Sequence, residues 1–230
     1  MKPRLRFWIL ACALVIGGPA VAQTNVTLVL PVPGAPLSAE IVEERTTKLP
    51  DGTSKTEVLT SKVYRDGAGR MRTETDVPGA SGEPLVHIFN KPDGFMAILL
   101  PLEKGGGRLQ FSKKQQSEGG FGFSNPSPLS GVTGKKTWKA EGLGKQTIEG
   151  IEFEGTRNTI TVENQPSIIG IEETWAADKL GLFGMLKSSD PNLEITAKIR
   201  NLDRQDPDPE LFKIPPDYLV RDLKSDDTVQ

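Results

Sequence analysis

Residues 193–200, with the sequence LEITAKIR, alternate without interruption between apolar and polar side chains. A period of two places all the apolar side chains on one side of a β-strand. The apolar set is Leu193, Ile195, Ala197 and Ile199. Strands with one wet face are typical of antiparallel sheets. This stretch therefore predicts an antiparallel sheet that buries one of its faces.

Working outward, short turn signals separate further segments of the same kind. Residues 50–52 (PDG), 66–69 (DGAG) and 92–94 (PDG) combine the residue types that favour tight turns. Strands joined by such short turns pair antiparallel. The predicted strands cover residues 37–48, 54–65, 70–77, 84–91, 95–101, 137–145, 168–176 and 182–188.

The segment 147–154 (TIEGIEFE) is also predicted as strand, with Ile151 and Phe153 on one face. Beyond Gly155 the apolar residues occupy even-numbered positions, Ile160 and Val162, instead of odd-numbered ones. A change of parity at a glycine is what a β-bulge produces. The sequence therefore predicts a bulge at Gly155.

The fold class follows from these segments. The chain holds 24 Gly and 18 Pro among 230 residues, which disfavours long helices. Only residues 208–212 (DPELF) resemble a helix start, with an aspartate cap and proline at the first position. We predict a mainly β protein: a single large antiparallel sheet curled into an open half-barrel, with one short C-terminal helical turn. A closed barrel or a sandwich is the alternative.

The first 22 residues have the composition of a secretory signal peptide. A basic start precedes an apolar run, and small residues at 20–22 precede a cleavage site between Ala22 and Gln23. The apolar run is too short for a transmembrane anchor, and the context of Cys12 favours signal cleavage over lipidation. We expect an exported protein, periplasmic or secreted, whose mature chain has no cysteine and no transmembrane segment.

The mature chain is expected to form one β-rich domain over residues 37–220. An extended lead-in covers residues 23–36, in which residues 26–30 could add an edge strand. Residues 112–134, rich in Gly and Ser, are predicted to be a flexible loop that carries Phe121 and Phe123. A polar tail covers residues 221–230.

The residue inventory argues against common catalytic and metal sites. His87 is the only histidine, and no serine has the context of a nucleophile elbow. The acidic run 206–210 favours a helix cap over a calcium loop. A net charge of −2 gives no reason to expect nucleic acid as a partner. We predict no enzyme activity and no cofactor, although carboxylates distant in sequence could still meet.

Several motifs carry a resemblance to a family. They are residues 63–72 (VYRDGAGRMR), 142–150 (GLGKQTIEG), 154–157 (EGTR), 172–175 (EETW), 206–212 (DPDPELF) and 216–218 (PDY). Together they resemble uncharacterised exported proteins of soil bacteria such as the Acidobacteria. The resemblance runs from about Leu37 to Val220 and implies export but no activity. In its architecture alone the chain resembles the LolA-type lipoprotein carriers, which implies an incomplete barrel with an apolar concave face.

These observations lead to a hypothesis about function. The leading expectation is non-catalytic binding of an apolar group, a lipid or a lipidated protein, on the concave face. The alternative is an interaction or sensor module that docks an envelope protein through a sheet edge or the hairpin with Arg70 and Arg72. Whether the apolar face is an open groove or a filled core is left open. The predicted ligand face consists of Trp138, Phe153, Trp175, Phe183 and Met185.

Overall fold

A computed structural model describes residues 26–76, 82–113, 115, 125, 127–129 and 131–223, without the side chains of residues 166–168. The described residues form one sheet of twelve strands. The strands are β1 (Leu37–Lys48), β2 (Ser54–Arg65), β3 (Met71–Thr75), β4 (Leu85–Asn90), β5 (Phe95–Leu100), β6 (Gly105–Gln110), β7 (Lys136–Ile148), β8 (Ile151–Val162), β9 (Gln165–Ala177), β10 (Leu182–Ser189), β11 (Leu193–Asp203) and β12 (Leu219–Leu223).

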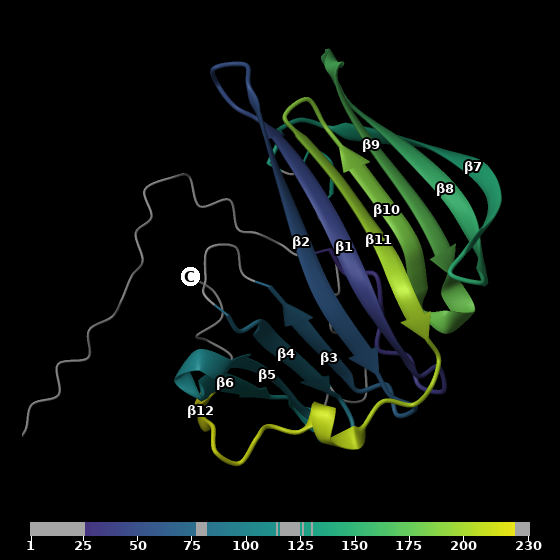
Figure 1. The fold of residues 1–230 in the computed structure, drawn as a ribbon. Coiled ribbons are helices and arrows are strands. Elements are labelled where there is room, and N and C mark those ends of the chain that lie inside the picture. Colours follow the sequence, from purple (N-terminus) through teal and green to yellow (C-terminus); the bar gives the residue numbers. More distant parts are fainter. Residues whose placement is uncertain are drawn as a thin grey trace, which may run out of the picture.

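The sheet consists of two antiparallel meanders joined side by side. Strands β1 to β6 follow one another outward from β1, and strands β7 to β11 return from the opposite edge. The meanders meet where β1 pairs with β11, with Ile41 opposite Ile199. Strand β12 lies parallel to β6, so the sheet is mixed. The sheet bends between β2 and β3 and does not close into a barrel (Figure 1). The predicted curled open sheet is thus confirmed, apart from this one parallel strand.

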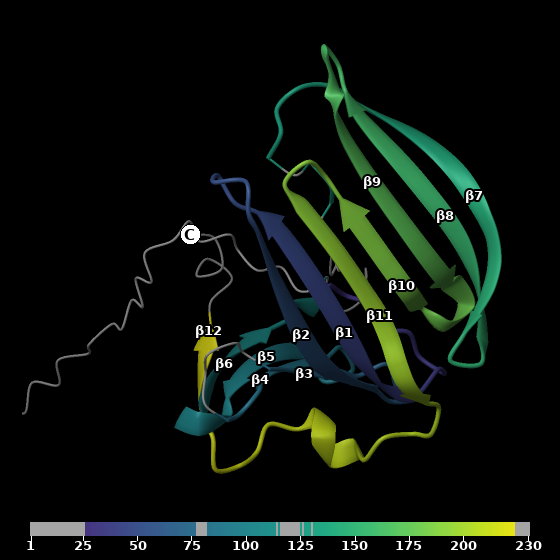
Figure 2. The same cartoon turned by 45° about the horizontal axis from the view of Figure 1, so that its top comes forward.

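Short 3-10 turns connect parts of the sheet. They are η1 (Pro101–Glu103), η2 (Asp178–Leu180) and η3 (Pro209–Phe212). The predicted C-terminal turn is η3, in which the side chain of Asp208 accepts a hydrogen bond from the backbone of Glu210. The chain after β11 runs along one end of the sheet, through η3, to β12 (Figure 2). The turns η1 and η2 were not predicted, because each is a single turn without an amphipathic pattern.

Two details of the predicted strands need correction. The segment 147–154 contains a turn at Glu149 and Gly150, whose φ angles are 48° and 75°. The expected bulge lies on the partner strand, because the register shifts between Gly142 and Gly144 of β7, opposite Gly155. The sequence located the irregular pairing but placed the extra residue on the wrong strand.

The ends of the domain also differ from the prediction. Val26, Leu28 and Val29 of the lead-in are buried in the main core, and Val29 forms an isolated bridge with Leu182. The lead-in is therefore a core segment and not an edge strand. At the other end, residues 221–223 belong to β12 and not to a polar tail. The signal segment, Phe121, Phe123 and residues 224–230 lie outside the described residues, as does much of the loop 112–134.

Two apolar cores support the sheet, and a third cluster holds Leu129, Ile160 and Val162. The larger core joins the lead-in to β1, β2, β10 and β11, and includes Ile41, Val63, Leu186 and Ile199. The smaller one lies on β4 and β5, where Val86, Ile88, Ala97 and Leu99 pack against residues of the C-terminal segment.

Candidate functional site

Strand pairing places three of the five predicted ligand-face residues together. Met185 lies opposite Trp175, and Trp175 lies opposite Gly155. Phe153 has the same parity along β8 as Gly155, so it shares this face. Phe153 is fully buried, and the ring of Trp175 occupies the space where a Cβ atom on Gly155 would lie. Phe153 therefore lies in the larger core, and Trp175 packs against it.

Phe183 lies opposite Ala176 and packs against the same core as Phe153 and Trp175. Among the four aromatic residues of the predicted face, only Trp138 is separate from this core. Trp138 lies opposite Ile160, whose parity along β8 differs from that of Phe153. Trp138 is 61% exposed on the edge strand β7. The five residues do not line a single face, because a change of register at the bulges alters which residues point together. Whether any of them contacts a ligand stays a prediction.

The open question of a groove or a filled core has a structural answer for the larger core. The buried lead-in fills the space beside β10, where the backbone of Phe183 donates to the carbonyl of Leu28 at 2.8 Å and Leu30 donates to the carbonyl of Gly181 at 2.9 Å. Hydrogen bonds of this kind extend the sheet locally. The chain thus covers part of its own apolar face.

An open groove lies next to this covered region, along β8, β9 and η2. We call it the Phe183 groove; its volume is about 760 Å³. Its apolar lining comes from Ile151, Phe153, Ala176, Leu180 and Phe183. Its charged lining comes from Lys145, Glu152, Glu154, Asp178 and Lys179. An apolar floor with charged groups around it can hold an apolar chain and leave a polar end in water.

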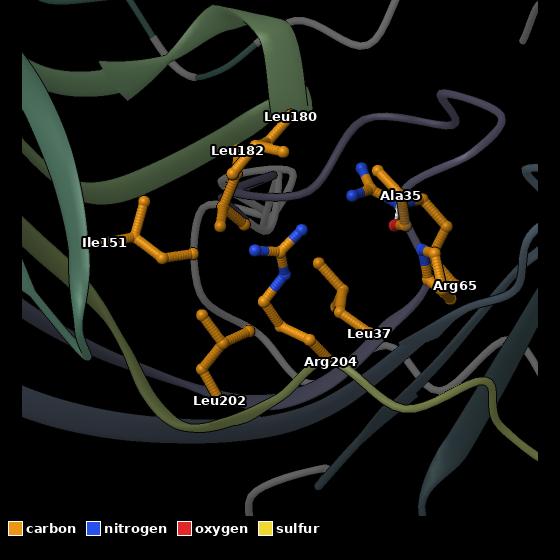
Figure 3. Close-up of a pocket in the computed structure, with 9 residues that line it drawn as sticks. Ala35, Leu37, Arg65, Ile151, Leu180, Leu182, Leu202 and Arg204 are labelled. Atoms are coloured by element: carbon orange, nitrogen blue, oxygen red, sulfur yellow. Dashed lines mark hydrogen bonds between the residues drawn. The ribbon is translucent and has the colours of Figure 1, made fainter.

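A second, narrow hollow lies at the end of β2, and it has room for about one water molecule. We call it the Arg65 pocket. Its apolar lining includes Leu37, Ile151, Leu180, Leu182 and Leu202. The guanidinium of Arg204 points into it among these side chains (Figure 3). Ile151 and Leu180 line both hollows, so the Arg65 pocket and the Phe183 groove share a wall.

Arg65 is completely buried and carries its charge without a carboxylate. Its Nε donates to the carbonyl of Ala35 at 2.7 Å, and its Nη1 donates to the carbonyls of Leu30 and Gly181 at 2.6 Å and 3.2 Å. Its Nη2 is buried and has no hydrogen-bond partner among the described residues. Leaving a buried donor unpaired is unfavourable, because the group loses its water.

The charge on Arg65 persists despite this environment. Burial, followed by repulsion from Arg204, lowers the pKa of Arg65 to about 10. This pKa still lies well above neutrality, so Arg65 is a cation at physiological pH. Arg204 is exposed and forms no ion pair within the described part of the chain. Two cations therefore face one apolar pocket.

The second buried arginine, Arg45, differs from Arg65 because it forms an ion pair with a carboxylate. Arg45 donates from Nη2 to Oε1 of Glu43 at 2.6 Å, and both side chains are nearly inaccessible. The other carboxylate oxygen of Glu43 accepts from the backbone of Val26 at 3.1 Å. This pair holds the start of the described chain on β1, and its charges balance.

The two arginines of the predicted docking hairpin are engaged within the fold. Arg70 forms an ion pair with Asp66, and its guanidinium lies 5.2 Å from the ring centre of Phe212. Arg72 forms an ion pair with Glu74 at 2.6 Å. Both side chains are partly buried. Their contacts account for their positions without an external partner.

His87 lies mid-strand on β4, and burial lowers its pKa. Across the described residues no cluster of three or more His, Cys, Asp or Glu side chains could hold a metal ion. Within the same part of the chain no helix is long and apolar enough to cross a membrane.

The sequence analysis did not identify Arg65 and Arg204 as site residues. One signal was present: Arg65 has the same parity along its strand as Leu59 and Val63, which are buried. An arginine in the apolar register of an alternating strand indicates a buried charge. Nothing local in the sequence predicts that Arg204 approaches it.

Comparison with known proteins gives no family for the chain. No protein-family description matches it, and no curated protein sequence matches it. Solved structures show a remote likeness. A LolA superfamily protein from Nitrosomonas europaea is 8% identical with a TM-score of 0.36, covering 79% of this chain and 91% of that one.

Two other solved structures match at a similar level. A chain in the complex of MucA and MucB from Pseudomonas aeruginosa is 13% identical with a TM-score of 0.44, covering 79% of this chain and 56% of that one. The lipoprotein LppX from Mycobacterium tuberculosis is 12% identical with a TM-score of 0.35, covering 74% and 88%. Similarities this remote carry no conclusion about what the chain binds. Membership of the exported soil-bacterial family stays a prediction.

Proposed function

We propose that this is an exported, non-catalytic binding protein that holds an apolar chain, the acyl group of a lipid or of a lipidated protein, in the Phe183 groove. The observation that carries the proposal is the groove itself, in which Ile151, Leu180 and Phe183 present apolar surface beside a filled core. Each methylene buried there contributes about 0.8 kcal/mol before ordering costs are subtracted.

A neutral apolar probe tests the proposal. N-phenyl-1-naphthylamine fluoresces more strongly in an apolar environment, and we expect the mature chain to bind it with a Kd of about 100 μM or tighter. Phe183→Ser removes apolar surface from the groove and should weaken binding about tenfold. Ile171→Ser is the matched control, because Ile171 is an exposed residue of β9 outside the groove lining. Equal binding by both variants, or no binding by the parent chain, would contradict the proposal.

A second candidate function is docking of an envelope protein through a sheet edge. Exposed leucines favour it: Leu100, Leu102 and Leu219 are 42%, 64% and 86% exposed. Leu100 and Leu219 both lie opposite Gly105, so they flank one glycine near the β12 edge. This edge is a better candidate than the hairpin with Arg70 and Arg72. Retention of an envelope protein by the parent chain but not by a Leu102→Asp, Leu219→Asp variant is the expected result.

A further inference from the structure

The two edges of the twelve-stranded sheet differ in length. Strand β12 has five residues, whereas β7 has thirteen and, among the described residues, pairs only with β8. Strand β7 is the outermost strand on its side of the sheet (Figure 1). An edge strand directs every second pair of backbone N–H and C=O groups away from the sheet, where another strand can bond to them. Strand β7 is therefore the longer open edge of the described sheet.

The charges on this edge decide what can pair with it. Lys139 is exposed and forms no ion pair within the described part of the chain. Lysines on an edge strand usually prevent pairing. Glu141 lies on the same face of β7, because it is two residues away. Glu141 is exposed and lies 3.9 Å from Arg157, whose nearer partner is Glu173 at 2.7 Å. The edge thus carries one cation and one carboxylate side by side.

A second copy of the chain presents these two residues in complementary order. If two β7 strands pair antiparallel with Ala140 opposite Ala140, each Lys139 lies opposite the Glu141 of the other copy. The same pair forms twice, because the arrangement has two-fold symmetry. Opposite charges directly across a strand pair attract each other, whereas like charges there repel. The charges of β7 therefore match a second β7 in this register.

The same register places an exposed tryptophan over a glycine. Trp138 is 61% exposed, and a Cβ atom on Gly142 would have no atom within 4 Å. With Ala140 at the centre, Trp138 of one copy lies directly opposite Gly142 of the other, on one face of the sheet. Within the chain, Trp175 lies opposite Gly155 in this way, and its ring covers that glycine. An aromatic ring over a glycine stabilises a strand pair.

We infer that the protein forms a two-fold symmetric dimer, in which β7 of one copy pairs antiparallel with β7 of the other and Ala140 lies at the symmetry axis. The register shift between Gly142 and Gly144 ends regular pairing at both ends of this stretch. An interface of one short strand pair is small, so we expect a weak dimer with a Kd of about 100 μM. The dimer does not depend on the proposed function.

Sedimentation equilibrium of the mature chain tests the dimer. Between about 5 μM and about 1 mM, we expect a change from monomer to dimer. The Kd should become several-fold weaker when NaCl is raised from about 0.05 M to about 0.5 M, because salt screens exposed charge pairs. A chain that stays monomeric at the highest concentration would overturn the inference. Species larger than a dimer would also overturn it, because pairing at one edge with two-fold symmetry is closed.

Reciprocal charge changes test the register. Lys139→Glu places two carboxylates opposite each other at both ends of the pair, and Glu141→Lys places two ammonium groups there. Each variant alone should associate about tenfold more weakly than the parent chain. An equimolar mixture should regain the parent affinity, because each strand then meets one of opposite charge.

The matched control makes the same charge changes away from the edge. Lys198→Glu and Glu194→Lys change exposed residues of β11, which has a neighbour on both sides. These two variants should associate as the parent chain does, alone and mixed. Parent-like association of Lys139→Glu alone, or a mixture with Glu141→Lys that stays weak, would overturn the register.

A glycine variant tests the position of the tryptophan ring. Gly142→Ala has free space within one copy, so it should not lower the free energy of unfolding. In the dimer its methyl group would lie where the ring of Trp138 is expected, so association should weaken about fivefold. Trp138→Ser should weaken association to a similar extent. Val58→Ser is the control, because Val58 is 59% exposed on the interior strand β2.

The dye that probes the groove separates the two proposals. Trp138 and Gly142 do not line the Phe183 groove, so both edge variants should bind N-phenyl-1-naphthylamine as the parent chain does. Parent-like association of either edge variant would overturn the register. Dye binding that is lost while the parent chain still dimerises would contradict the proposed function and support the dimer.

Discussion

The lead-in, residues 26–36, and the C-terminal segment, residues 204–218, cover different parts of the sheet by different physical means. The lead-in buries Val26, Leu28 and Val29 in the larger core, and its backbone also bonds to the buried side chains of Glu43 and Arg65. The C-terminal segment depends above all on Phe212, which is fully buried. The lead-in therefore combines apolar burial with bonds to buried charged groups, whereas one buried aromatic ring dominates the C-terminal segment.

The largest effect is expected where cover depends on one apolar side chain. Phe212→Ala should lower the free energy of unfolding by about 3–5 kcal/mol, the usual cost of truncating a buried phenylalanine. Urea denaturation measures it. Leu219→Ala serves as the control, because Leu219 is 86% exposed, and should change stability by less than about 0.5 kcal/mol. A loss below about 1 kcal/mol for Phe212→Ala would show that the segment is held by something else.

The second-largest effect on stability is expected at Glu43, whose carboxylate binds the backbone of the lead-in. Glu43→Gln removes the carboxylate that forms an ion pair with the buried Arg45, and it weakens the acceptor for the backbone of Val26. We expect a loss of about 2–4 kcal/mol in the free energy of unfolding. Glu44→Gln changes the exposed neighbour on the same strand and should have little effect. If the two variants unfold at the same urea concentration, the lead-in does not depend on this pair.

A smaller effect is expected at the cap of η3. Asp208→Ala removes the acceptor for the backbone of Glu210, which lies 2.9 Å from Oδ1, and should cost about 1 kcal/mol. Asp208→Asn keeps an acceptor oxygen and should retain most of the stability. Equal losses in the two variants would mean that the charge matters and not the hydrogen bond.

The smallest effect depends on pH and involves His87, in the middle of β4. Burial lowers the pKa of His87 below its ordinary 6.5. As the pH falls through 6.5 the unfolded chain takes up a proton before the folded chain does, so the folded state loses stability. Between about pH 7 and about pH 5 the free energy of unfolding should fall more for the parent chain than for His87→Gln. Parallel pH profiles would contradict this.

Much of the fold could be predicted from local patterns. The bounds of β1 and β2 agree with the predicted 37–48 and 54–65, because alternation and turn residues are local signals. The turn at Glu149 and Gly150 was missed because glutamate rarely adopts a positive φ, whereas Asn-Gly or Asp-Gly would have signalled it.

The candidate site could be predicted only in part. Phe153 and Phe183 line the groove as expected of apolar strand residues, but Trp138, Trp175 and Met185 do not. Odd and even positions indicate the two faces within one strand. At a bulge the register shifts, so odd positions of one strand no longer share a face with the same positions of its neighbour. The Arg65 pocket brings together residues from β2, η2, β8 and the segment after β11. Such long-range proximity has no local signature.

The pairing of β1 with β11 also has a consequence for how the chain folds. Strand β1 pairs with β2 on one side and with β11 on the other. Because β11 begins at Leu193, the ribosome synthesises this second partner only after most of the chain. Contacts between residues so distant in sequence slow folding, since a long loop must close before they form. Until then the hairpin of β1 and β2 has an unpaired edge on β1, which another chain could join. We therefore expect the pairing of β11 with β1 to limit the rate of folding. A chain that is truncated before β11 should aggregate.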